Sequence, residues 1–230
     1  MSSSSRLILI FAIVFAILII NPAFLSQQFA PYPLLKVGDV TDILTPLILI
    51  PLYWLLFRQG EAPSTLENIL FLVFAAFWVE GQGMHLGANS IGHLLDDAKG
   101  TDPQLLTHFF DEVLGHYLWH IGMVALTGLL IWRQIKNPLE AALSSLWSEI
   151  VAALIYGIVY FIIVIEAGTV PLGLPFAVIV AIVGLMERKS LRQQPITLFF
   201  VAAHGLALIL FVVWFVKWGG FPQFSDLGWI

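Results

Sequence analysis

The 230-residue sequence contains no cysteine, and only 11% of its residues are charged. The absence of cysteine excludes disulfide scaffolds, thiolate metal sites and a cysteine nucleophile. The low charge excludes an ordinary soluble domain, in which roughly a quarter of the residues are charged. No basic run suits a nucleic-acid partner, and the net charge is −5. The chain is 59% hydrophobic with a mean hydropathy of +0.92, which predicts an integral membrane protein.

Seven apolar segments are predicted to cross the membrane, because a spanning helix needs about 20 largely apolar residues. We therefore expect an all-α seven-helix bundle that forms a single polytopic domain over residues 1–230. The first segment follows one arginine, as in a signal peptide, but no A-x-A cleavage site follows it, so an uncleaved span is favoured. The predicted spans are approximately 7–25, 41–57, 65–98, 103–133, 139–166, 172–187 and 195–217.

Basic residues predict the orientation of the bundle, because cytoplasmic loops of membrane proteins are enriched in lysine and arginine. Seven of the ten basic residues fall at span ends on the side of the N-terminus: Arg6, Arg58, Arg133, Lys136, Arg188, Lys189 and Arg192. The opposite side holds Lys36, Lys99 and Lys217. We therefore expect a plasma or inner membrane protein with a cytoplasmic N-terminus and an external C-terminus.

Five of the six histidines fall within residues 78–120, around a predicted turn. Gly100 suits the left-handed position after a helix, and Asp102-Pro103 suits the start of the next one. Two helices joined by so few residues are antiparallel neighbours. The third and fourth spans are therefore predicted to form a tight hairpin.

The hairpin register is predicted to bring polar side chains to matching depths. It places His85 beside His116, Asn89 beside Glu112 and His93 beside His108. At 100° per residue, the polar residues of the third span share one side of the helix. On the fourth span, the i, i+4 spacing predicts a single stripe of four polar residues: His108, Glu112, His116 and His120.

Gly83 and Gly87 form a G-x-x-x-G pair on the side of the third span opposite its histidines. This motif predicts that another helix packs closely there. Glu80 lies on the same side and is expected to meet another helix, with His204 of the last span as one possible partner. A lone histidine in a span is more often a packing residue than a ligand.

A metal site between the third and fourth spans, near the outer leaflet, is the leading interpretation of the cluster. Ionisable groups at a helix centre cost about 2.5–3.5 kcal/mol each on insertion scales and usually mark function. Histidines at i and i+4 chelate one ion, and imidazole with carboxylate suits zinc, iron or copper. One or two metals are expected, with the ligands drawn from His85, Asn89, His93, His108, Glu112, His116 and His120.

Other interpretations of the cluster remain open. His93, His108 and Asp111 could simply lie at the water interface, where polar groups cost little. A histidine pair across the hairpin could ligate haem, and the whole cluster could be a metal-free polar or proton-relay network.

The function predicted from these residues is a metal-dependent membrane enzyme that hydrolyses or oxidises a lipid or another hydrophobic substrate. Glu112 or Asp111 would be the catalytic carboxylate, either as a ligand or as a general base. The alternative is a non-enzymatic haem- or metal-binding subunit of a larger membrane complex. A channel or transporter is less favoured, because the polar residues gather towards one side of the membrane.

Overall fold

The computed structural model describes residues 2–138 and 146–229, and within these ranges the chain folds into helices without a β-strand. The predicted start of the fifth span, residues 139–145, lies outside the described residues. The helices of one turn or more are α1 (Ser3–Ile20), η1 (Asn21–Phe24), α2 (Val37–Asp42), α3 (Leu44–Phe57), α4 (Thr65–Gly92), η2 (Asp96–Ala98), α5 (Asp102–His108), η3 (Phe109–Gly115), α6 (His116–Lys136), α7 (Trp147–Glu166), α8 (Val170–Met186), η4 (Leu191–Gln193) and α9 (Pro195–Trp218).

Six helical segments are long and apolar enough to cross a membrane, which confirms the prediction of a helical membrane bundle. They are Ser3–Phe24, Val37–Phe57, Thr65–Gly92, Asp102–Lys136, Trp147–Glu166 and Pro195–Trp218. The remaining prediction, the sixth span at 172–187, corresponds to α8, an apolar helix of 17 residues. At 1.5 Å per residue this helix is about 25 Å long, close to the thickness of a thin hydrocarbon core.

Local sequence signals explain several helix ends. The Ser64 hydroxyl accepts from the Glu67 backbone N–H, and the Glu67 carboxylate accepts from the Ser64 backbone N–H at 2.6 Å. This capping box satisfies amides that would otherwise lack partners at the start of α4. At the other end of the chain, Gly219 adopts φ 70° and ends α9 in the left-handed conformation that glycine allows.

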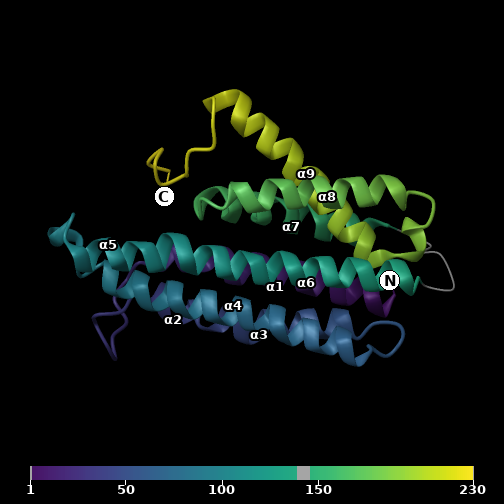
Figure 1. Ribbon diagram of the computed structural model, residues 1–230, viewed down its shortest axis with the longest axis horizontal. Coiled ribbons are helices and arrows are strands. Elements are labelled where there is room, and N and C mark those ends of the chain that lie inside the picture. The colour runs from purple at the N-terminus through teal and green to yellow at the C-terminus, as the bar shows by residue number, and fades with distance from the viewer. Residues whose placement is uncertain (1, 139–145, 230) are drawn as a thin grey trace.

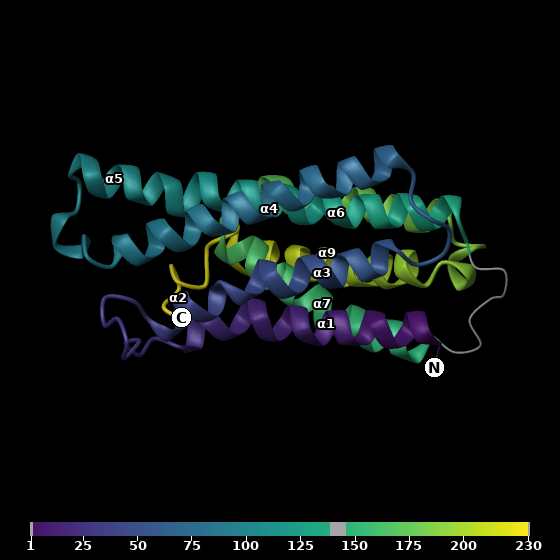
Figure 2. The ribbon, with the colours of Figure 1, turned by 90° about the horizontal axis from the view of Figure 1, so that it is seen from below.

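Most of the long helices run roughly along one common direction, and α9 crosses them obliquely (Figure 1). Figure 2 shows α4 and α6 together along one side, with α1 and α3 along the other. A buried aromatic core joins α1, α7 and α9 through Phe11, Phe15, Tyr156, Phe199 and Phe200. The connections that carry seven basic residues lie at the end of the bundle that holds the N-terminus, and the other three basic residues lie at the far end.

The predicted hairpin of the third and fourth spans is present as α4 packed along α5, η3 and α6. The helices touch through glycines: a Cβ added to Gly122 would lie 2.5 Å from the Trp78 backbone N, and one added to Gly115 would lie 3.0 Å from the His85 backbone N. Gly81 is equally close to the Trp119 backbone. These contacts agree with the predicted register to within about one residue.

The prediction for Gly83 and Gly87 is wrong for the described helices of this chain. A Cβ added at either position would have no neighbour within 4 Å, and both glycines are exposed. The glycines that allow close packing are Gly81, Gly115 and Gly122, which face the hairpin partner. A G-x-x-x-G spacing shows which side of a helix carries small residues, but it does not show whether that side packs against a helix of the same chain.

The predicted i+4 stripe on the fourth span is interrupted, because Phe109–Gly115 is wound as a π-helix. A π-helix has wider turns than an α-helix, so the 100° periodicity does not hold through this segment. Asp111 is consequently buried, whereas the Glu112 side chain is 39% exposed and His108 is exposed. π-Helical turns within α-helices occur frequently at functional sites.

Candidate functional site

A cavity of about 370 Å³ opens at the end of the bundle away from the N-terminus, between the hairpin and the segment that links α1 to α3. Most of its polar lining comes from the hairpin and from the segment between α1 and α3. Helix α7 supplies the apolar Ile163 and the carboxylate of Glu166. The lining residues include Ile19, Pro22, Leu25, Lys36, Asp39, Asp42, Gln82, His85, Leu86, Asn89, His93, Glu112, His116, Trp119, Ile163 and Glu166. Most of the predicted site residues therefore line this one cavity.

His85 and Asp111 form the closest contact between ionisable groups across the described part of the hairpin. The His85 Nδ1 lies 2.6 Å from Asp111 Oδ1, and both atoms are buried. The side chains of His85 and Asp111 are 21% and 11% exposed, respectively. Neither atom has an aligned hydrogen-bond partner, so the pair is held by proximity and charge more than by ideal hydrogen-bond geometry. The π-helix brings Asp111 to this position.

The His116 ring lies against the His85 ring in a tilted arrangement, at the matching depth that the register predicted. The two ring centroids are 4.6 Å apart with an interplanar angle of 39°. His116 Nδ1 is buried without a hydrogen-bond partner among the described residues, and Glu112 Oε2 lies 3.7 Å from it, beyond hydrogen-bond distance. A porphyrin does not fit between two rings at this separation, so these two imidazoles do not form a haem-ligand pair in this conformation.

His120 points away from the cavity, although it was predicted as a ligand. Its Nδ1 contacts the Thr169 hydroxyl in the connection between α7 and α8, and its side chain is buried. The ring centroid lies 6.4 Å from that of His116, and the cavity lining does not include it. His120 therefore joins the hairpin to the α7–α8 connection.

The remaining predicted ligands, Asn89, His93 and His108, each contact different residues or line a different cavity. Asn89 donates to Asp39 Oδ1 at 3.4 Å, and the Lys36 ammonium lies 3.2 Å from His93 Nδ1. His108 lies across a second cavity of about 170 Å³ that it shares with Asn89, His93 and Asp111. His93 and His108 thus share a cavity at the depth predicted for them, near the mouth of the site.

Besides Glu166, three charged residues of the cavity were not predicted as site residues, namely Lys36, Asp39 and Asp42. They belong to the segment between α1 and α3, which folds over the cavity. Asp39 accepts from the Lys36 backbone N–H at 2.8 Å and caps α2, and Asp42 accepts from the Gln82 side-chain amide at 2.8 Å. The sequence did contain a signal, because two aspartates in "KVGDVTD" open an otherwise apolar span.

This segment is held in place by a close backbone contact. A Cβ added to Gly38 would lie 2.5 Å from the Pro22 carbonyl oxygen, so no larger residue fits there without a shift. The Gly38 backbone N–H also donates to the Leu25 carbonyl oxygen at 2.8 Å. The contacts of the Gly38 backbone with Pro22 and Leu25, which lie more than ten residues earlier in the chain, thereby hold Lys36, Asp39 and Asp42 over the hairpin.

No group of three or more His, Asp or Glu side chains is placed to hold a metal ion in residues 2–138 and 146–229. His85 and His116 are adjacent, but Asp111 contacts only the first of them, and Glu112 turns partly outward. The predicted seven-residue ligand set is therefore spread over two cavities and the α7–α8 connection. The metal site remains a prediction.

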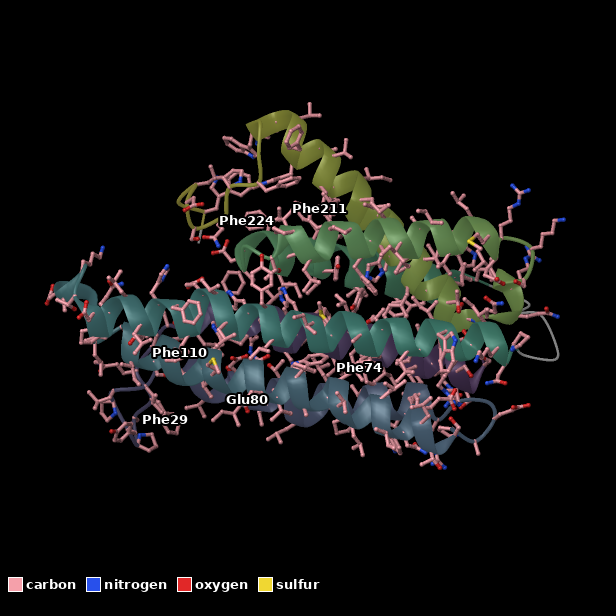
Figure 3. The ribbon with its side chains drawn as sticks, in the orientation of Figure 1. Phe29, Phe74, Glu80, Phe110, Phe211 and Phe224 are labelled. Atoms are coloured by element: carbon pink, nitrogen blue, oxygen red, sulfur yellow. The ribbon has the colours of Figure 1, made fainter. Side chains whose placement is uncertain are left out.

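His204 is remote from the site, and the packing interpretation describes it better. It is fully buried on α9 among Tyr156, Tyr160, Phe176 and Phe200, with its Nδ1 donating to the Phe200 carbonyl oxygen at 2.7 Å. Its proposed partner Glu80 is exposed on the outer side of α4 (Figure 3).

Comparison with known proteins shows a similarity to a membrane protein of the dog. The chain is 25% identical over 214 residues to the ceroid-lipofuscinosis neuronal protein 6 homolog of the dog, Canis lupus familiaris. The alignment covers 81% of this chain and 66% of the dog protein. No family model matches the chain, and no solved structure matches it.

Proposed function

We propose that the cavity is the active site of a membrane-embedded enzyme in which His85, held by Asp111, acts as a general base. The observation that carries this proposal is the 2.6 Å contact between His85 Nδ1 and Asp111 Oδ1 at the cavity wall. A carboxylate at Nδ1 favours the tautomer that is protonated there, which leaves Nε2 able to accept a proton. Because Nδ1 is buried, the opposite ring edge, which carries Nε2, is the part available to the cavity.

The lining supports an amphipathic substrate. Ile19, Leu25 and Ile163 supply an apolar wall beside the imidazoles and carboxylates. The polar end of a lipid-like molecule would enter the cavity while its chain stays among the helices or in the bilayer. Such a site suits hydrolysis of an acyl ester or amide. Nε2 of His85 takes a proton from water as its oxygen attacks the acyl carbon, and the same proton then goes to the leaving group.

A lipid turnover assay tests this proposal. The wild-type protein is placed in nanodiscs with fatty-acyl esters and amides of glycerol, sphingoid bases and glycerophosphocholine, and released products are measured by mass spectrometry. His85→Gln should lower the rate about 100-fold or more, the usual contribution of a general base. His204→Gln, the same change at a histidine of α9 that does not line the cavity, should leave the rate unchanged. Absence of turnover by the wild type, or full activity of His85→Gln, would reject the proposal.

A bound transition metal is the second candidate, and the charge of the cavity favours it. Asp39, Asp42, Glu112 and Glu166 line the cavity against one lysine, Lys36, and an excess of carboxylates attracts cations. Zinc, iron or copper held by His85 and His116 would require Glu112 to turn inward. Such an ion would act as a Lewis acid in the same hydrolysis or would support oxidation, near the outer leaflet as the sequence predicts.

Elemental analysis with an optical spectrum of the purified protein separates the two candidates. A stoichiometric metal that is lost in both His85→Ala and His116→Ala supports the metal site. A metal-free wild type that turns over lipid supports the His85–Asp111 pair acting alone. A bound metal or haem without any turnover would instead favour a non-enzymatic membrane subunit.

The orientation follows from the two ends of the bundle. The end with seven basic residues is proposed to be cytoplasmic and the cavity end external, with α8 as a seventh span. Because the chain lacks cysteine, a single cysteine at Lys99 or at Arg188 gives a clear test. A membrane-impermeant maleimide added to intact cells should label Lys99→Cys and spare Arg188→Cys, and the reverse pattern would invert the orientation.

A further inference from the structure

Glu80 is an acidic residue in the middle of α4 that the cavity does not use. It stands 15 residues after Thr65 and 12 before Gly92, so it is about 18–22 Å from either helix end. It is exposed and forms no hydrogen bond or ion pair with any residue in the described part of the chain. In a bilayer this carboxyl group would face hydrocarbon, where an unpaired acid is strongly unfavourable.

The surface around Glu80 has the pattern of a helix interface. Seam positions follow one another at steps of four and three residues, the spacing of a coiled-coil seam. The glycines at 83 and 87 have no neighbour within 4 Å, so another backbone has room to approach beside the carboxyl group. The seam, which we call the α4 seam, consists of Val73, Phe77, Glu80, Met84, Gly87 and Ile91.

A groove continues the α4 seam towards the cavity end of the hairpin. It has a volume of about 280 Å³ and lies between α4 and the α5–η3 segment. Met84, Ala88, Ile91, Thr107 and Phe110 line it, and Phe110 and Glu80 lie on the same half of the hairpin (Figure 3). Side chains of a second helix packed on the seam would fill this groove.

We infer that the α4 seam binds a second copy of this chain in a two-fold dimer. All ten basic residues stand near helix ends or in connections, so a second copy offers no cation at the depth of Glu80. It does offer its own Glu80, which a two-fold axis along the membrane normal places at the same depth. A protonated carboxyl group donates to the other carboxyl group, so the pair satisfies itself without a cation.

Cysteine crosslinking in membranes tests the dimer, and the cysteine-free background makes each crosslink unambiguous. Gly83→Cys should form a disulfide-linked dimer when copper phenanthroline is added. Gly205→Cys on α9 is the matched control, because Gly205 also has no neighbour within 4 Å, and it should stay monomeric. Equal crosslinking at both positions, no crosslinking at Gly83→Cys, or crosslinking to a different polypeptide would overturn the inference.

Dimer affinity in lipid bilayers, measured by single-molecule photobleaching, tests the role of the carboxyl group. Glu80→Leu should raise the dimer dissociation constant about three- to tenfold, the range of an interhelical hydrogen bond in membranes. Glu80→Gln should keep the affinity, because two amides also pair. Gly83→Ile should raise the constant more than about tenfold, and Gly205→Ile should not change it. An unchanged constant in both Glu80→Leu and Gly83→Ile would contradict the dimer.

Discussion

Two histidines, the partly buried His85 on α4 and the fully buried His204 on α9, show how differently the two halves of the bundle use the same side chain. His85 contacts the Asp111 carboxylate at the wall of a cavity. His204 is enclosed by aromatic rings and donates to a backbone carbonyl on its own helix. A histidine with an acidic partner and an open space is equipped for proton transfer, whereas one inside an aromatic cluster serves packing.

The halves also differ in the side chains between their helices, although each has a close glycine contact: a Cβ added to Gly157 of α7 would lie 2.5 Å from the Ala203 carbonyl oxygen of α9. The hairpin of α4 and α6 is joined through glycine backbones at Gly81, Gly115 and Gly122. The half formed by α1, α7 and α9 packs through rings, such as Phe15 with Tyr156 at 4.5 Å and Tyr156 with Phe199 at 5.4 Å between ring centroids. Close backbones fix the relative position of His85 and Asp111, while interlocked aromatic side chains give a rigid support.

The largest effect is expected from a bulky residue at the hairpin contact. Gly122→Leu places side-chain atoms against the Trp78 backbone, which cannot move aside as a flexible side chain would. We expect a loss of about 3 kcal/mol or more in unfolding free energy, together with a disrupted cavity. Gly205→Leu, at an open position on α9, should change stability by less than about 0.5 kcal/mol. Thermal unfolding in detergent measures both, and equal stabilities would contradict the packing described.

The next effect is expected at Asp111, the acid that contacts His85. Asp111→Asn keeps the shape of the side chain but removes the charge that holds His85 Nδ1–H. Turnover should fall about 100-fold while the helical circular dichroism spectrum is retained. Asp226→Asn, at an exposed acid near the C-terminus, is the control and should retain full activity.

A smaller effect is expected at the histidine of the aromatic half. His204→Phe removes a bond to the Phe200 carbonyl oxygen but also removes a buried Nε2 that has no partner among the described residues. The two changes oppose each other, so the unfolding free energy should change by less than about 1 kcal/mol. Lipid turnover should be unaffected. A loss of activity comparable to that of His85→Gln would end the distinction between the two histidines.

The smallest effect is expected in the connection between α8 and α9. The hydroxyl of Ser190 and the side-chain amide of Gln194 donate to the Glu187 carboxylate and lower its pKa. A lowered pKa contributes stability above the ordinary pKa, and this contribution is lost as pH falls through the lowered value. Ser190→Ala should raise the pKa of Glu187 towards its ordinary value, which carbon NMR of labelled glutamate measures. An unchanged pKa would show that the hydroxyl does not bond the carboxylate in solution.

Much of the fold follows from the sequence because a bilayer imposes helix lengths and because Gly100 and Asp102-Pro103 mark the hairpin turn. The pairing of His85 with His116 follows from that turn. The π-helix of Phe109–Gly115 does not follow, because the 100° periodicity used to place side chains assumes an α-helix throughout.

The contribution of residues 21–42 was also not predictable in detail. Lys36, Asp39 and Asp42 reach the cavity through main-chain contacts between segments such as Gly38 and Pro22, which no periodic pattern reports. The polar character of "KVGDVTD" marked the segment as unusual for a span. Its partners Gln82, Asn89 and His93 depend on how the connection folds back over the hairpin.

The most direct test of the account is a double-mutant cycle on lipid turnover with His85→Gln, Asp111→Asn and the double variant. Residues that act as one unit lose activity together, so the double variant should be about as slow as His85→Gln alone. Losses that multiply, with the double variant slower by the product of the two single effects, would show that the two side chains act independently and would contradict the proposed pair.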